Sequence, residues 1–126
     1  MSGLDLREID VTGGTMRGTN FDRGDLRGAR FVDVKASRAR FREAKLAGIR
    51  FDGADLDGAQ FGRADLTGAS LRNTTLRATD FQRAILKGAD FTGARVLNTN
   101  FFRANLSGAT WVDGRSCAEG STGLCR

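Results

Sequence analysis

The sequence contains no histidine, no proline and no tyrosine, and only two cysteines and one tryptophan occur in its 126 residues. Histidine is the commonest general base in enzymes, and neither an isolated pair of acids nor a glycine-rich loop that opens a helix takes its place here. The absence of proline is compatible with a fold in which nearly every backbone N–H donates to a neighbouring strand. We therefore expect a protein that is not an enzyme and that binds no cofactor and no metal.

Long apolar runs are missing as well. No segment approaches the roughly 18 consecutive apolar residues that a membrane-spanning helix needs, so we expect no membrane span. The first residues, Met1 to Leu6, lack both the basic and the apolar region of a secretory signal peptide. The formal net charge is +5 at pH 7, and the isoelectric point is near 10.2. Such a charge favours acidic partners if the basic residues gather on one surface.

An apolar residue recurs at every fifth position of the chain, from Leu6 to Trp111. Two residues before it stands a small or apolar residue, most often alanine, and the position between them is polar in every unit except at Ile85. Inward, outward and inward side chains in succession are typical of a very short strand, and the two remaining residues of each unit can turn a corner. A period of five fits neither an α-helix nor a coiled-coil heptad.

Several of these units share one short motif. Residues 54–58, 64–68 and 104–108 read Ala-Asp-Leu-Asp-Gly, Ala-Asp-Leu-Thr-Gly and Ala-Asn-Leu-Ser-Gly. The motif resembles the A(D/N)LXX signature of the pentapeptide-repeat family, and the resemblance covers roughly residues 4–113. It implies an all-β fold, a right-handed quadrilateral parallel β-helix (a pentapeptide-repeat solenoid) with about 5.5 coils of 20 residues. We expect residues 1–113 to form this β-helix and residues 114–126 to form a non-repeat C-terminal cap that contains the cysteine pair.

Residues twenty positions apart share their character, as the stacked coils of a four-sided solenoid require. We predict one interior ladder of stacked rings from Phe21, Phe41, Phe61, Phe81 and Phe101. Corner residues repeat with the same period, and two corners carry mostly residues that tolerate positive φ. There we predict positive φ at Gly28, Gly48, Gly68, Gly88 and Asn73. A third corner carries arginines, and we predict a different turn type with negative φ at Arg63, Arg83 and Arg103.

Basic residues gather in two places. The first is a run within about one coil, which would form a positive belt around the rod: Arg30, Lys35, Arg38, Arg40, Arg42, Lys45 and Arg50. The second is the arginine corner, formed by Arg23, Arg63, Arg83 and Arg103. Both are candidate sites for an anionic partner, and the alternative is a solvated surface that keeps the solenoid soluble. No exposed aromatic residues interleave with these arginines, which disfavours nucleic acid as the partner.

Apolar residues at outward positions gather near the C-terminal end, at Leu97, Phe102 and Val112. We expect the C-terminal tail to fold back over the last coil and to cover Phe102 or Leu97 at least in part, with Trp111 closing the core. The alternative is that these residues contact a partner.

Cys117 and Cys125 are close enough in sequence to form a disulfide that staples this tail. A disulfide indicates an oxidising compartment, so we expect a periplasmic or secreted protein whose signal peptide is absent from this sequence. A cytoplasmic protein with two free thiols is the alternative.

Three functions stay open at this point. The leading hypothesis is a non-enzymatic structural or protein-interaction module with an unknown protein partner, present as a monomer or a weak end-to-end dimer. The resemblance implies a second function, because some pentapeptide-repeat proteins protect DNA gyrase by imitating duplex DNA, but the net charge of +5 disfavours it. The third is the binding of an anionic polymer or surface through the basic belt.

Overall fold

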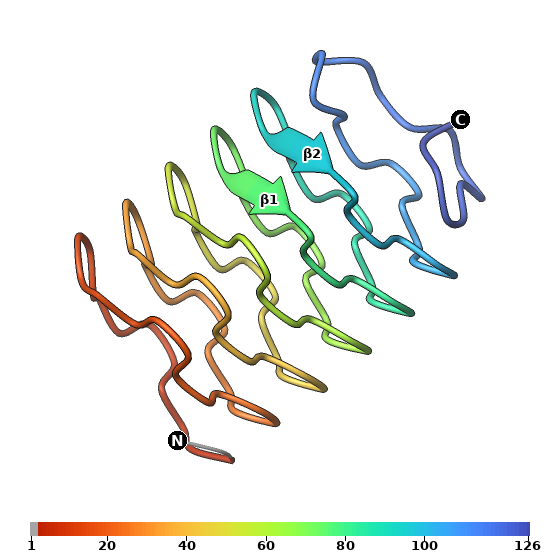
Figure 1. The fold of residues 1–126 in the computed structure, drawn as a ribbon. Helices are drawn as coiled ribbons and strands as arrows, with labels where there is room; N and C mark the ends of the chain where they lie inside the picture. Colours follow the sequence, from red (N-terminus) through yellow and green to blue (C-terminus); the bar gives the residue numbers. More distant parts are fainter. Residues whose placement is uncertain (1–2) are drawn as a thin grey trace.

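Short parallel bridges between residues twenty positions apart wind the chain into a β-helix (Figure 1). The computed structural model describes residues 3–126, and the bridges run from Asp5 with Asp25 to Asp90 with Thr110. Regular strands form at one place, where β1 (Thr75–Arg77) pairs in parallel with β2 (Arg95–Leu97). The all-β prediction is confirmed, and the offset of the bridges is the period that the sequence columns predict.

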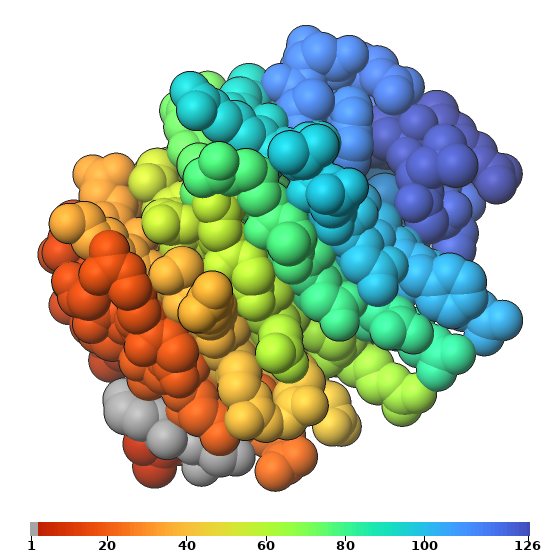
Figure 2. All heavy atoms as spheres, viewed as in Figure 1, coloured from red at the N-terminus to blue at the C-terminus, as the bar shows by residue number. Residues whose placement is uncertain are grey.

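Each coil places its apolar residues inside the rod, and the coils lie as adjacent bands across the surface (Figure 2). The predicted phenylalanine ladder is confirmed. Its ring centroids lie 5.1, 4.9, 4.9 and 5.3 Å apart from one end to the other, and the planes of neighbouring rings differ by no more than 12°. Rings from a second wall, such as Phe31 and Phe51, meet this ladder edge to face. Stacking at this spacing follows from the distance between hydrogen-bonded strands.

The glycine and asparagine corners have the predicted conformation. The φ angles of Gly28, Gly48, Gly68, Gly88 and Asn73 lie between 57° and 71°. Positive φ at the third residue of each turn is what a type II turn requires. These predictions are confirmed.

The arginine corner has the same conformation, so the predicted negative φ is wrong. Arg63, Arg83 and Arg103 have φ angles of 58°, 60° and 57°. At Arg63 and Arg83 the reason is hydrogen bonding between coils, because their N–H groups donate along the rod to the carbonyls of Gln82 and Phe102 at 2.9 and 2.8 Å. A non-glycine residue in this region costs about 1–2 kcal/mol. An unsatisfied buried donor costs about 1–3 kcal/mol, so keeping the bond outweighs or offsets the strain.

The C-terminal tail folds back over the last coil (Figure 1). Antiparallel bridges join Asn105 to Thr122 and Thr110 to Ser116. Cys117 and Cys125 form the predicted disulfide, with their Cα atoms 4.8 Å apart. The tail therefore satisfies the open edge of the coil, which an uncapped solenoid would leave exposed.

The core at this end is closed as expected, but the apolar surface outside it is not covered. Trp111 packs against Phe91 and Phe101 with ring centroids 5.5 and 5.4 Å away, and Val112 is partly buried against the core. Leu97 and Phe102 stay 61% and 53% exposed, so the expected cover over them is absent. The physical reason is that the tail lies across the end of the rod, whereas these two side chains project from its sides.

Candidate partner-binding surface

The basic belt is distributed over all sides of the rod, and most of its charge is paired. Arg30 lies 3.6 Å from Asp10, and Arg50 lies 3.1 Å from Asp52. Within residues 3–126, no acidic side chain lies within ion-pair distance of three exposed members, which are Lys35, Arg38 and Lys45. Lys35 and Arg38 belong to one repeat unit, residues 34–38, whereas Lys45 lies two units later in the chain.

Two other members of the belt hold a buried carboxylate. The side chain of Asp22 is only 4% exposed and accepts hydrogen bonds from Arg40 Nη2 at 3.0 Å and Arg42 Nη2 at 2.9 Å. It also accepts the backbone N–H of Arg42 at 2.9 Å. The sequence analysis did not find this pairing, although the twenty-residue period places residue 42 directly above residue 22. Arg40 and Arg42 therefore have a structural role.

Surface aspartates accept hydrogen bonds from their own repeat unit or from the next coil. Asp65 and Asp90 each accept the N–H of the residue two positions later, at 3.0 and 2.9 Å. Burial raises the pKa of Asp57, but hydrogen bonds from Arg77 outweigh this effect and hold that pKa below its ordinary value. At the first coil, hydrogen bonds from Arg7 lower the pKa of Asp5 to about 2. The lowered pKa values keep Asp5 and Asp57 ionised at neutral pH, and the hydrogen bonds to all four aspartates stabilise the turns.

The arginine corner differs, because its cations outnumber their acidic partners. Arg23 pairs with Glu43 at 4.0 Å. The next three arginines, which we call the arginine ridge, are Arg63, Arg83 and Arg103. They are exposed, and in the described part of the chain none of them has an ion-pair partner. The N–H groups of Arg63 and Arg83 bond to the next coil, so the ridge is a row of like charges spaced by about one strand separation, about 4.8 Å.

Apolar side chains accompany the C-terminal end of the ridge. The guanidinium carbon of Arg103 lies 5.2 Å from the centre of the exposed Phe102 ring, a cation–π contact. Ile85 and Leu124 are also exposed. Ile85 follows Arg83 by two residues, around the same corner. Leu124 follows Gly123, whose N–H donates to Ala104, so it also lies near this corner.

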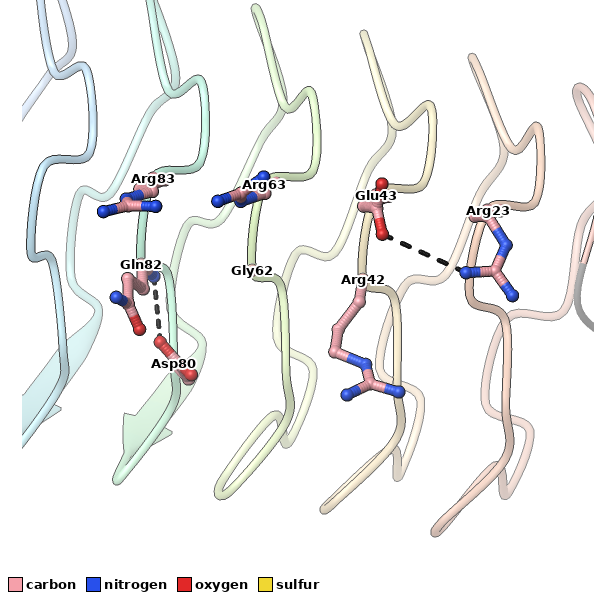
Figure 3. A pocket seen from close by; sticks show the side chains of 8 residues that line it. All are labelled: Arg23, Arg42, Glu43, Gly62, Arg63, Asp80, Gln82 and Arg83. Carbon is pink, nitrogen blue, oxygen red and sulfur yellow. Dashed lines mark hydrogen bonds and ion pairs between the residues drawn. The ribbon is translucent and has the colours of Figure 1, made fainter.

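A hollow of about 470 Å³ opens beside the ridge (Figure 3). Its lining consists of Arg23, Arg42, Glu43, Gly62, Arg63, Asp80, Gln82 and Arg83. Figure 3 shows Gly62 on the coil between those of Arg42 and Gln82, where it leaves a gap in the row of side chains. No residue of the hollow except the arginines was a candidate at the sequence level. The signal was present, because Gly62 interrupts a column of longer side chains at twenty-residue spacing.

These features define the class of the protein as a parallel β-solenoid whose surface side chains are arranged by stacked coils. The sequence matches the family described as "Pentapeptide repeat region" over residues 12–81, and that described as "Pentapeptide repeats (8 copies)" over residues 69–108. The chain therefore belongs to the pentapeptide repeat family. Proteins of this family are generally non-enzymatic structural or interaction modules. A comparison with curated proteins finds no match.

Similar solved structures are also pentapeptide repeat proteins. One from the cyanobacterium Cyanothece 51142 is 16% identical, with a TM-score of 0.49, and the match covers 78% of this chain and 80% of that one. A trypsin-treated form of QnrB1, a plasmid-mediated fluoroquinolone resistance protein, is 20% identical with a TM-score of 0.47, covering 94% and 78% of the two chains. A protein of the Arabidopsis thaliana thylakoid lumen is 28% identical with a TM-score of 0.34, covering 97% and 83%.

The structure adds one finding on membranes. Between residues 3 and 126 no helix is long and apolar enough to cross a bilayer.

Proposed function

We propose that this protein is a non-enzymatic interaction module that binds an acidic segment of a partner protein on the arginine ridge. The observation that carries the proposal is the row of three exposed arginines on successive coils, none of which forms an ion pair with a described residue. Elsewhere on the rod most arginines lie against aspartates, as Arg72 does against Asp90 at 3.0 Å. An anionic partner therefore gains the most binding free energy at the ridge, where it does not compete with aspartates of the same chain.

Electrostatics gives this gain a magnitude. Two unit charges about 4.8 Å apart repel by about 0.9 kcal/mol in bulk water, and by more beside a low-dielectric surface. The folded chain carries this repulsion between each pair of neighbouring ridge arginines. An acidic segment removes it and adds charge-assisted hydrogen bonds, for which the guanidinium fork is well suited.

The surroundings of the ridge favour a protein as the partner. Arginine and aromatic side chains are enriched in protein interfaces, and Phe102 beside Arg103 presents both. Single-stranded nucleic acid binds where several aromatic rings alternate with cations, and here one exposed ring ends the row. The positive ridge and the net charge of +5 also argue against imitation of duplex DNA. The basic belt is a weaker candidate for anionic polymers, because most of its arginines already hold aspartates.

A defined acidic polypeptide tests the proposal. Poly-glutamate of about twenty residues is titrated into the protein and followed by calorimetry at low salt. Replacing Arg63, Arg83 and Arg103 by glutamine is expected to weaken binding about tenfold, which corresponds to about 1.4 kcal/mol or roughly 0.5 kcal/mol for each lost pair.

The control variant replaces Arg30, Arg50 and Arg72 by glutamine, which changes the net charge equally but removes arginines that already have aspartate partners. It is expected to bind poly-glutamate within about twofold of the unaltered protein. Equal weakening in both variants would show that only net charge matters, and the proposal would fail. Tighter binding to single-stranded DNA than to poly-glutamate would favour the third function, the binding of an anionic polymer.

Three further properties belong to this proposal. We infer an oxidising compartment, periplasmic or secreted, which the Cys117–Cys125 disulfide supports. The repeat over residues 1–113 and the cap over residues 114–126 act as one body with a right-handed sense and about 5.5 coils. Alkylation of the native protein before reduction, followed by mass spectrometry, tests the compartment, because free thiols in freshly lysed cells would contradict it.

A further inference from the structure

The hollow beside Gly62 is open because glycine stands where the neighbouring coils carry longer side chains. The column on this side of the rod consists of Asp22, Arg42, Gly62, Gln82 and Phe102. A Cβ built on Gly62 would meet only the carbonyl oxygen of Gln82, at 3.8 Å, which is ordinary contact. Its φ angle also lies outside the left-handed region, so the backbone does not require glycine here. The effect of this glycine is to leave space.

The charge around this space is unbalanced. Four arginines and two carboxylates line the hollow, which gives a net charge of +2. Glu43 is paired with Arg23 on the side of the hollow away from Arg83, and Asp80 accepts the N–H of Gln82 at 2.9 Å (Figure 3). With Arg42 held by Asp22, the uncommitted cations of the hollow are Arg63 and Arg83.

The backbone N–H of Gly62, which lines the hollow, is a further hydrogen-bond donor. In this column the N–H groups of Asp22, Gln82 and Phe102 donate to a side chain two residues earlier, at 2.8 to 2.9 Å. At the corresponding place below Gly62 stands Gln60, whose side chain is one carbon longer. Of the described residues, none accepts the N–H of Gly62. The hollow thus combines two free guanidinium groups with a free backbone N–H.

We propose that this hollow binds one phosphomonoester dianion. The proposal rests on the function above, because the group most readily supplied is a phosphorylated side chain of the acidic partner. A phosphomonoester has three terminal oxygens in a tetrahedral arrangement, so it accepts from two guanidinium groups on successive coils and from the backbone N–H together. A carboxylate has two coplanar oxygens, which match the fork of a single arginine. The two guanidinium groups without an ion-pair partner, Arg63 and Arg83, carry a charge equal to that of the dianion with opposite sign.

Nuclear magnetic resonance on the intact protein tests this site. The probes are O-phosphoserine, an acidic peptide with one phosphoserine, the same peptide without phosphate, and inorganic phosphate. We expect saturable shifts of the amide signals of Gly62, Arg63, Gln82 and Arg83, and binding of the phosphopeptide at least about tenfold tighter than of its unphosphorylated form. If the phosphopeptide binds more tightly than inorganic phosphate, the natural ligand is a phosphate group attached to a polypeptide. If the two bind equally, the natural ligand is free phosphate.

Two variants separate this inference from the proposed function. Gly62→Gln fills the hollow and keeps every arginine, so it should abolish the preference for the phosphopeptide and leave poly-glutamate binding unchanged. Arg103→Gln lies on the ridge but outside the hollow, so it should weaken poly-glutamate binding and leave O-phosphoserine binding unchanged.

Should Gly62→Gln fail to fold, Gly62→Asn, which is shorter and also keeps every arginine, takes its place with the same expected loss of preference. The inference is overturned if Gly62→Gln retains the preference for the phosphopeptide, or if O-phosphoserine shifts signals all around the rod. In the first case the proposed function stands.

Discussion

Gly53 and Gly48 provide a matched pair that tests how closely the corners of successive coils pack. Both have a left-handed backbone, with φ of 71° and 70°. A Cβ at Gly53 would fall against Oδ1 of Asp33 on the preceding coil, whereas a Cβ at Gly48 would meet nothing within 4 Å. Alanine at either position therefore has the backbone cost, about 1 kcal/mol. Only at Gly53 must the Asp33 carboxylate also leave its rotamer, which adds about 0.5–1.5 kcal/mol.

Urea unfolding followed by circular dichroism measures both effects. Gly48→Ala is expected to lower the free energy of unfolding by about 1 kcal/mol and Gly53→Ala by about 1.5–2.5 kcal/mol. In a double-mutant cycle with Asp33→Ala, the additional cost at Gly53 should disappear, because the carboxylate that the new methyl meets is gone. Equal losses at Gly48 and Gly53, or additive losses with Asp33→Ala, would refute this account of the corner.

Three other predictions concern the core, the acid response and the target. Phe61→Ala, in the middle of the stacked ladder, is expected to cost about 3–5 kcal/mol in urea unfolding, and the partly exposed Phe101 clearly less; equal costs would contradict the packing. The lowered pKa of Asp57 stabilises the fold above its ordinary value of 3.8, so the stability difference between the unaltered protein and Asp57→Asn should shrink as the pH falls through the lowered pKa, and a constant difference would refute it. In a gyrase supercoiling assay, the protein should neither inhibit the enzyme nor rescue it from ciprofloxacin, and a stoichiometric, salt-resistant effect would favour a DNA mimic.

The interior of the rod is predictable from the sequence because the apolar residue at every fifth position marks a buried position. Phe41 and Phe61 differ by twenty positions and share one wall, and their rings stack at 4.9 Å as the period requires. The disulfide is predictable for a different reason, since Cys117 and Cys125 have no other cysteine to pair with. In both cases a local pattern is enough, because the number of alternatives is small.

The corners and the hollow depend on interactions between coils, which residue preferences do not reveal. Arginine disfavours positive φ, yet Arg63 adopts it because its N–H bonds to the coil above. The burial of Asp22 likewise depends on two arginines from the next coil. The hollow arises from an absent side chain at Gly62, which becomes visible in the sequence only when residues twenty positions apart are compared.

The conformation of the corner also determines what shapes can lie against the ridge. Because the N–H groups of Arg63 and Arg83 are bonded to the next coil, the arginines repeat at the pitch of the rod, about 4.8 Å. Side chains on one face of an extended strand recur about every 6.6 Å, so a strand laid along the rod falls out of step with the arginines after one contact. A flexible peptide adjusts to this only through its side chains. A column of acids across the rungs of another sheet repeats at about 4.8 Å and meets the ridge charge for charge. Under the proposed function, the fixed spacing of the ridge arginines therefore favours acidic side chains that repeat at about 4.8 Å, and a flexible acidic segment makes fewer simultaneous contacts.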